Sequence, residues 1–523
     1  MTTRTANLTE QEQEKSWMRY LLPRLGDVLF IALFVGVIAL GPRLMNMDGD
    51  LGRHLTIGGY ILDSLTIPTR DIFSHTMSGL HLTPHEWFAQ VLFALSYRLG
   101  GLDGVVLLCA LVIAATFSLV FRQSLVRSKV ILVSLGITIL AAAAASVHWL
   151  ARPHIFTLLF TVLWVGELEK WRRDESWRWW SLPLIMLVWV NTHGAFIIGI
   201  LIWLIYLGGS ILSGKGYLFS MNPDGGQGNY DSQKPARTWQ LFLVGISVML
   251  VTLINPAGWR VWATTFGFLQ NQYLVSHTVE YQAPDFQNSS FWPFLVMICL
   301  SISLAALNKK KLSLMPLLLL ISWTAFSLIS ARNIAVYAVI AAPILAGMSA
   351  LILRDNEVFT RFVAYDGRLR SMDKRLAGYF WPLVFSIVLG FVMVSGSAQI
   401  NDGTRNRFSE NVFPVEAVDW IEEHPASDPI FNYFPWGGYL LYRTWPEQLV
   451  FIDGQTDFYG ESLTRQYEKV ITLADGWLAV LDEYRVGRVI MPADSALVKE
   501  LSMRDEWELV YKDNTSAVLD ASP

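Results

Sequence analysis

The sequence predicts an α-helical membrane protein that crosses the bilayer many times and carries a small α/β domain outside it. Of the 523 residues, 53% are hydrophobic and only 16% are charged, which is more apolar than a soluble core requires. Repeated apolar runs approach the roughly 20 residues that cross a bilayer as a helix. After about residue 398 these long runs give way to short strand-like and helical segments, which is typical of a folded domain.

Hydropathy predicts about eleven membrane spans. They cover residues 26–45, 102–121, 130–149, 154–168, 179–191, 195–212, 239–254, 291–307, 312–330, 334–353 and 378–397. The 179–191 segment is short, so it could instead form one long broken helix with the segment after it.

Lysine placement decides between these alternatives. Before residue 398 the lysines are Lys15, Lys129, Lys170, Lys215, Lys234, Lys309, Lys310, Lys311 and Lys374. With two spans at 179–212 all of them fall on one side, whereas one merged span would place Lys215 and all later lysines on the other, against the positive-inside bias. We therefore predict two spans and a multi-pass protein of the cytoplasmic (inner) membrane.

This topology divides the chain into three regions. Residues 1–25 are cytoplasmic, residues 26–397 form the transmembrane module with a first outer loop at 46–101, and residues 398–523 form the extracytoplasmic domain. The polar N-terminus lacks a cleavable signal pattern, so we expect the first span to remain as an anchor. Segment 85–99 is helical and apolar but short for a span, which favours an interfacial position.

The outer tail has the alternation of a small α/β domain. Strand-like runs are Ile430–Phe434, Leu449–Asp453, Val486–Met491, Glu508–Tyr511 and Ser516–Leu519, and the helical stretches include Val415–Glu423 and Leu463–Ala474. Two tail motifs, Trp436–Tyr439 and Phe451–Asp457, are interpreted as strand-turn features with Gly-Gly at unusual dihedrals. Exposed aromatics beside acids could alternatively bind sugars.

Charge and cysteine content narrow the function. The net charge of -4 indicates nothing about nucleic acid. No basic tail and no alternation of aromatic and basic residues suggests such a partner, so we expect none. The two cysteines, Cys109 and Cys299, fall within apolar spans. We interpret them as core residues rather than a disulfide or metal pair.

The first outer loop gathers the residues best suited to chemistry. Asp48 and Asp50 flank a glycine, so one carboxylate could act as a general base on a hydroxyl, or the pair could hold a divalent cation such as Mg²⁺ or Mn²⁺. They could equally be solvated acids of a helix C-terminal turn. The same loop contains Arg53, His54, Asp71 and His75, and each histidine could be a metal ligand, a phosphate donor or a plain loop residue.

Seven arginines lie on the predicted outer side, against the positive-inside bias. They are Arg43, Arg53, Arg70, Arg98, Arg152, Arg260 and Arg332. Arg152 and Arg332 stand at span ends, where each could snorkel or pair with an anion, and we favour an anion such as a phosphate. His154 and His193 also stand at outer span ends. Glu280 could bind a sugar or a cation, or be a solvated loop acid, and Glu86 is interpreted as a first-turn acid that complements a helix dipole.

Several segments together resemble a known class. DGDLGRHLTIGGYIL, IPTRDIFSHT, HEWFAQ, WVNTHGAFIIG, INPAG, FPWGGYL and FIDGQTDFYG look like a group of bacterial GT-C-class membrane glycosyltransferases whose substrates are mostly unassigned. The resemblance runs through most of the chain, although these motifs cover about a quarter of it. The chain has no WWDYG-like motif, which argues against an oligosaccharyltransferase proper.

The resemblance implies transfer of a hexosyl or pentosyl unit, with inversion, from a polyprenyl-phosphate donor to a glycan, lipid or protein acceptor outside the cytoplasmic membrane. It places the base or metal ligand at Asp50 or Asp48. On this hypothesis Arg152 and Arg332 neutralise the departing phosphate, and the remaining substrate-binding residues are Arg53, His54, Asp71, His75, His154, His193 and Glu280. The alternatives are a transporter or flippase of lipid-linked glycans, and a non-catalytic assembly protein.

Overall fold

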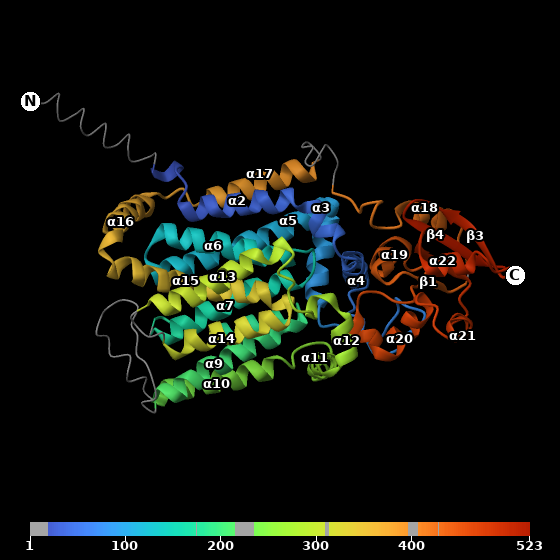
Figure 1. The fold of residues 1–523 in the computed structure, drawn as a ribbon, viewed down its shortest axis with the longest axis horizontal. Coiled ribbons are helices and arrows are strands. Elements are labelled where there is room, and N and C mark those ends of the chain that lie inside the picture. The colour runs from blue at the N-terminus through green and yellow to red at the C-terminus, as the bar shows by residue number, and fades with distance from the viewer. Residues whose placement is uncertain are drawn as a thin grey trace, which may run out of the picture.

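The computed structural model describes residues 19–173, 175–214, 235–308, 313–395, 406–426 and 428–522. Figure 1 shows a body of helices that run side by side, with a C-terminal part containing a sheet at one end. The helices of the body are α2 (Leu25–Ala39), α3 (Gly41–Asn46), α4 (Asp50–Ser64), α5 (Trp87–Ser128), α6 (Ile131–Ala145), α7 (His154–Arg172), α8 (Ser181–Val190), α9 (Ile197–Gly214), α10 (Pro235–Val251), α11 (Arg260–Gln270), α12 (Gln272–His277), α13 (Trp292–Leu307), α14 (Leu314–Ile329), α15 (Ile334–Asp355), α16 (Thr360–Arg375) and α17 (Trp381–Val394).

Every predicted span overlaps one of these helices. Within the described ranges, six helices are long and apolar enough to cross a bilayer, at Arg19–Ala39, Trp87–Ser128, Ile131–His148, Gly194–Leu212, Ser289–Leu307 and Ala331–Asp355. Four shorter apolar helices lie at Ser181–Val190, Arg237–Val251, Leu314–Ile329 and Trp381–Val394, and α7 contains the predicted span 154–168. The predicted fold class is confirmed, and the protein is a multi-pass membrane protein. The number of spans stays a prediction.

The central helix of the body is α15, which packs against α5, α6, α7, α13 and α14. All of its residues from Ile334 to Met348 are buried. Many of them are alanines, which let neighbouring helix backbones approach closely inside a membrane protein. This helix therefore fixes the positions of the helices that carry the candidate site.

The chain reverses direction between α8 and α9, as the lysine argument requires. At the start of α8, Ser181 Oγ donates to Glu167 Oε2 at 2.8 Å. Tyr206 in α9 donates to Glu169 Oε1 at 2.7 Å. Because Glu167 and Glu169 belong to the same turn of α7, α8 leaves this region and α9 returns to it. Of the lysines used in the argument, Lys15, Lys215, Lys234 and Lys309–Lys311 lie outside the described residues.

The predicted interfacial helix continues into the second predicted span. Helix α5 runs from Trp87 to Ser128 but contains two non-helical residues, Gly100 and Gly101, the latter at φ 61°. A positive φ suits glycine because it has no side chain to clash. The kink therefore separates the 87–99 segment from the rest of α5.

The C-terminal part contains a four-stranded mixed sheet with the order β1-β2-β4-β3. Its elements are α18 (Val415–Glu423), β1 (Ile430–Asn432), α19 (Gly437–Thr444), α20 (Thr456–Ile471), α21 (Trp477–Glu483), β2 (Arg488–Pro492), α22 (Ala496–Leu501), β3 (Trp507–Lys512) and β4 (Ser516–Ala521). Strands β1 and β2 are parallel, so α19 to α21 form the crossover between them. The predicted domain limit near residue 398 lies outside the described residues and stays a prediction.

Two expectations about this part were wrong. Leu449–Asp453 does not join the sheet, and Val450 instead forms an isolated bridge with Ser74 of the first outer loop. Trp436–Tyr439 forms a short 3₁₀ turn and the start of α19 rather than a strand turn. Gly437 and Gly438 have no positive φ, so close approach to other backbone, described below, explains them.

Candidate functional site

The two acids of the first outer loop lie at the start of α4. Asp50 is the first residue of the helix, and its backbone N–H donates to Oδ1 of Asp48 at 3.2 Å. A carboxylate at a helix N-terminus is stabilised by the unpaired N–H groups there. Asp48 follows the end of α3 and Asp50 begins α4, so both acids lie at the end of the helical body that faces the C-terminal part. Neither is a freely solvated acid, because both side chains are mostly buried.

Arg152 gathers three carboxylates around one guanidinium group. Its Nη1 lies 2.9 Å from Oδ2 of Asp48 and 2.5 Å from Oε1 of Glu280, and its Nη2 donates to Oδ2 of Asp50. We call Asp48, Asp50, Arg152 and Glu280 the Arg152 cluster. It carries three acids for one guanidinium group, so the partners of Arg152 in the structure are acids of the protein itself. Its predicted role in binding an anion stays a prediction.

The two aspartates of the cluster differ in access. The side chain of Asp48 is 16% exposed and that of Asp50 is 5% exposed. The geometry between Asp48 Oδ2 and Arg152 is that of an ion pair only, and this buried oxygen has no hydrogen-bond partner among the described residues. Oδ2 of Asp48 can therefore still accept a hydrogen bond, whereas the side chain of Asp50 is less accessible to solvent.

Arg332 extends the site on the side of Glu280. Its Nη1 donates to the hydroxyl of Tyr281 at 2.9 Å and lies 3.8 Å from Oε2 of Glu280. Its Nη2 lies 3.2 Å from Nε2 of His193. Because a guanidinium group only donates, Nε2 must accept, and the ring proton lies on Nδ1, 2.8 Å from the Thr157 hydroxyl.

A second group of charged residues surrounds Arg53, which like Asp50 belongs to α4. Arg53 is buried, donates to Oε1 of Gln455 at 3.0 Å, and lies 3.5 Å from Oε2 of Glu86 and 3.8 Å from Oδ1 of Asp453. We call Arg53, Glu86, Asp453 and Gln455 the Arg53 cluster. Because Gln455 and Asp453 belong to the C-terminal part, the site is built from both parts of the protein.

Glu86 connects the two groups. It precedes α5 but makes no side-chain capping hydrogen bond. Its carboxylate lies 4.0 Å from Nδ1 of His54 and 3.9 Å from Nε2 of His193. The sequence predicted that Glu86 complements a helix dipole, whereas in the structure its carboxylate lies between Arg53, His54 and His193.

Burial and charge shift the pKa values of these groups in different directions. Burial raises the pKa of Asp48 to about 6 despite the nearby Arg152, and Asp50 and Glu280 contribute to the increase. Burial likewise raises the pKa of Asp453 to about 6, against the effect of Arg53. For Glu280 the effect of burial is outweighed by Arg152 and Arg332, which lower its pKa to about 2. Burial and the arginines near His54 hold its pKa well below the ordinary value, so it is neutral.

Glycines let the C-terminal part meet the first outer loop without intervening side chains. A β-carbon on Gly52 of α4 would lie 2.2 Å from the carbonyl oxygen of Gly438 in α19. A β-carbon on Gly454 would lie 1.6 Å from Oδ1 of Asp50. The tail motifs FPWGGYL and FIDGQTDFYG therefore form the face that contacts DGDLGRH.

Asp71 and His75 lie outside both clusters. Asp71 accepts from the backbone N–H of Phe73 and of Ser74, each at 3.1 Å. His75 Nε2 lies 2.9 Å from the carbonyl oxygen of Ile430. Asp71 thus stabilises the fold of the loop itself, and His75 connects the loop to the C-terminal part. Their predicted role in substrate binding stays a prediction.

His154 begins α7 two residues after Arg152. Its Nε2 contacts the carbonyl oxygen of His148, and His148 Nε2 in turn lies 2.9 Å from the carbonyl oxygen of Ala331. These two histidines therefore connect the loop of Arg152 to the turn that carries Arg332. His154 thus contacts the loop that carries Arg152 and helps to hold it in position.

Asp48 and Asp50 both contact the guanidinium group of Arg152. Their predicted role as ligands of a divalent metal ion stays a prediction. The described ranges contain no group of three or more His, Cys, Asp or Glu residues arranged to hold a metal ion.

Four site residues were missed or given other roles in the sequence interpretation: Glu86, Tyr281, Asp453 and Gln455. Two of them stand in the motif DGQTD, whose polar residues interrupt an apolar tail segment. These polar residues were the feature of the sequence that could have indicated a functional role for Asp453 and Gln455. It could not reveal the partner, because Arg53 and Gln455 are distant in the sequence.

Comparisons with known proteins identify the fold. No family model and no curated protein sequence matches the chain. An archaeal oligosaccharyltransferase, AglB from Archaeoglobus fulgidus, in complex with an inhibitory peptide and a dolichol-phosphate, is similar in structure with TM-score 0.55 and 11% identity, over 89% of this chain and 69% of that chain. Its apo form gives TM-score 0.53 and 10% identity over 89% and 70%.

A weaker similarity involves ArnT from Cupriavidus metallidurans bound to undecaprenyl phosphate, with TM-score 0.47 and 14% identity over 95% of this chain and 99% of that chain. The similarity to the archaeal enzyme shows that the chain has the GT-C fold. The resemblance noted in the sequence is thus confirmed at the level of structure.

Proposed function

We propose that the protein is a membrane glycosyltransferase that moves a sugar from a polyprenyl-phosphate donor to an acceptor on the outer face of the cytoplasmic membrane. The observation that carries the proposal is the Arg152 cluster, which puts two aspartates of the first outer loop at one end of a GT-C-fold body. The similar archaeal enzyme was solved with a dolichol-phosphate, which supports a lipid phosphate as the carrier of the sugar.

The chemistry is a single displacement. The acceptor hydroxyl attacks the anomeric carbon while the bond from that carbon to the phosphate oxygen breaks, so the sugar inverts its configuration. Asp48 or Asp50 takes the hydroxyl proton. Asp48 has the more exposed side chain and the unsatisfied oxygen, and Asp50 has the helix N-terminus and the contact with the C-terminal part.

The leaving phosphate needs a positive partner as its charge develops. Arg332 suits this role, because its side chain is 32% exposed and its acid partner Glu280 also faces Arg152. Arg152 instead positions the two aspartates. This division of roles refines the expectation that both arginines bind the phosphate.

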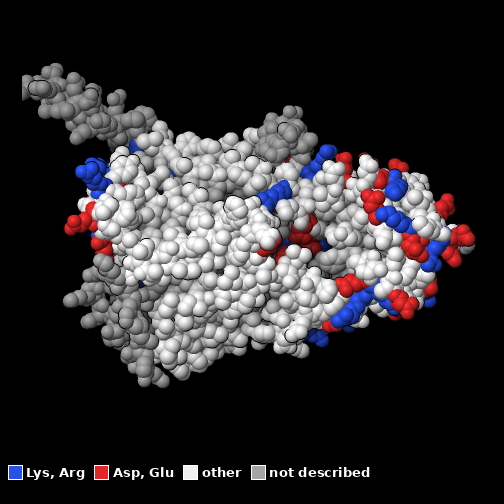
Figure 2. Space-filling view, in the orientation of Figure 1, with Lys and Arg blue, Asp and Glu red and all other residues white. Residues whose placement is uncertain are grey.

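The distribution of charge supports one-sided chemistry. Figure 2 shows a nearly uncharged surface over the helical body, with charged side chains over the C-terminal part and at the opposite end, and a group of acids at the junction. A transporter or flippase would instead place ionisable residues near the bilayer midplane.

The test is sugar transfer by the purified full-length protein, supplied with a set of radiolabelled polyprenyl-phosphate sugars and cell-envelope acceptors, with and without divalent cation. Asp48→Asn and Asp50→Asn are measured separately, with Asp63→Asn as the control because Asp63 is an exposed acid at the end of α4. Loss of transfer in at least one of the two variants, with the fold and the control intact, supports the assignment. Full activity in both would overturn it.

A further inference from the structure

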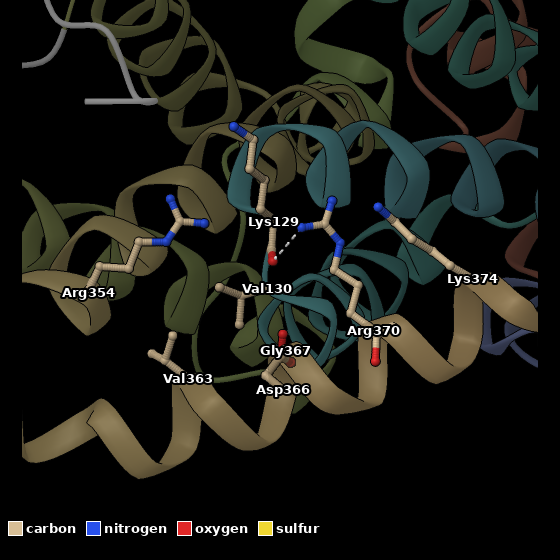
Figure 3. A pocket seen from close by; sticks show the side chains of 9 residues that line it. Lys129, Val130, Arg354, Val363, Asp366, Gly367, Arg370 and Lys374 are labelled. Atoms are coloured by element: carbon tan, nitrogen blue, oxygen red, sulfur yellow. Dashed lines mark hydrogen bonds between the residues drawn. The ribbon is translucent and has the colours of Figure 1, made fainter. Parts of the chain in front are cut away.

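A cavity lies at the end of the helical body opposite the Arg152 cluster. Its volume is about 270 Å³, several times the roughly 30 Å³ that one water molecule occupies in the liquid. It opens between the link from α5 to α6, the end of α15 and the helix α16 (Figure 3). We call it the α16 pocket.

Basic residues from all three elements line the α16 pocket. They are Lys129 of the link, Arg354 of α15, and Arg370 and Lys374 of α16. The acid in the lining, Asp366, accepts from the backbone N–H groups of Ile131 and Leu132, each at 2.9 Å. Its carboxylate therefore caps α6, and the pocket keeps an excess of positive charge.

Two guanidinium groups are fixed in position by backbone contacts. Arg354 Nη2 donates to the carbonyl oxygen of Ser128 at 2.6 Å. Arg370 Nη1 donates to the carbonyl oxygen of Lys129 at 3.2 Å, as Figure 3 shows. A guanidinium group has five N–H donors. The buried Nε of Arg370 has no hydrogen-bond partner among the described residues, and a buried donor of this kind indicates a missing acceptor.

The surroundings suit the surface of a membrane. Helix α16 carries five basic and two acidic residues in the sequence TRFVAYDGRLRSMDKR, and Val358, Tyr365 and Met372 on and next to it are exposed. Exposed apolar side chains on a basic helix are typical of a helix lying in the bilayer interface. A pocket beside such a helix would lie at the level of lipid headgroups.

We propose that the α16 pocket binds a phosphate group, either that of an anionic lipid headgroup or that of a soluble phosphate compound. Arginines held in fixed orientations bind phosphate oxygens through paired hydrogen bonds, and basic pockets between membrane helices bind anionic headgroups. The site is separate from the Arg152 cluster and does not depend on the proposed transferase activity.

The experiment measures binding to the delipidated full-length protein in detergent. Radiolabelled phosphatidylglycerol is the probe, phosphatidylcholine with the same chains is the zwitterionic comparison, and inorganic phosphate is the competitor. The variants are Arg370→Gln and Lys374→Gln. Arg368→Gln is the matched control, because it removes the same charge from an exposed position of α16 that does not line the pocket.

We expect each pocket variant to bind phosphatidylglycerol about tenfold more weakly, while the control binds like the wild type. Inorganic phosphate that binds more weakly than phosphatidylglycerol assigns the site to a lipid headgroup, and phosphate that binds more tightly than the lipid assigns it to a soluble phosphate compound. Equal binding of both lipids, or equal losses in Arg368→Gln and the pocket variants, would overturn the proposal. Within the part of the chain that the structure describes, Lys374 makes no backbone hydrogen bond like that of Arg370, so Lys374→Gln separates ligand binding from folding.

Discussion

Gly454 of the C-terminal part touches the carboxylate of Asp50 so closely that a β-carbon on Gly454 would lie 1.6 Å from Oδ1. No side chain fits between the two residues. The position of Asp50 is therefore set from one side by Arg152 of the helical body and from the other by the backbone of the C-terminal part.

Gly454→Ala should displace Asp50 and lower sugar transfer by about 10²-fold, the effect typical of a misplacement of about 1 Å at a reacting centre. The control is Gly59→Ala in α4, where a β-carbon meets nothing within 4 Å. That substitution should raise helix stability by up to ~1 kcal/mol. Transfer rates and thermal unfolding of both variants check the prediction, and unchanged transfer in Gly454→Ala would contradict it.

Arg53→Met should lower the free energy of unfolding by about 3–5 kcal/mol, because it leaves the buried carboxylates of Glu86 and Asp453 without their cation. Arg98→Met is the control. Arg98 pairs with Asp63 at 2.6 Å at an exposed position, so its loss should cost less than about 1 kcal/mol. Denaturant unfolding of the purified variants gives both values, and equal stabilities would show that the Arg53 cluster contributes little.

Sugar transfer should decline as the pH falls below about 6, because the raised pKa of Asp48 makes this carboxyl group neutral there. A neutral carboxyl group neither accepts a proton nor pairs with Arg152. Since the charge of Glu280 raises the pKa of Asp48, Glu280→Gln should move the acidic limb of the pH–rate profile to lower pH. A shift to higher pH would contradict this coupling.

Arg332→Gln should reduce the turnover rate by about 10²–10³-fold, the usual effect of removing one group that stabilises the charge of a transition state. Arg407→Gln is the control, because Arg407 is exposed and forms an ion pair with Glu410 alone among the described residues, at 3.6 Å. Turnover and donor concentration dependence are measured for both. A change confined to donor affinity would assign Arg332 to ground-state binding instead.

The orientation of the chain is tested with single cysteines in a Cys299→Ser background, where the remaining Cys109 is buried. Met503 in the C-terminal part is 82% exposed and Met372 in α16 is 64% exposed. A membrane-impermeant maleimide should label Met503→Cys in intact cells and Met372→Cys only after permeabilisation. The opposite pattern would invert the predicted topology.

Hydropathy predicted where the apolar helices lie, and lysine placement predicted the reversal between α8 and α9. The reversal at Asn191–His193 followed from lysine placement even though α8 has only ten residues. The strands of the tail were less predictable, because Val450 bridges Ser74 of a distant loop. Local β-propensity gives no information about such a partner.

The site was predicted as a set of residues on one side of the membrane but not as a network. Arg152 and Arg332 were both expected to bind an anion, and only the fold shows that Arg152 already holds three carboxylates. Glu86 was missed because its position before a helix suggested a simpler role. Pairing between side chains distant in the sequence depends on tertiary packing, which one sequence does not specify.

The backbone contact between α4 and α19 has a consequence for protein engineering. Gly52 and Gly438 approach each other so closely that neither position has room for a side chain. The C-terminal part could therefore be joined to another membrane body only if that body also had a glycine at the matching position. A graft would have to transfer α4 together with α19. The helical body and the C-terminal part are therefore one structural unit at this contact, although they look like separable modules.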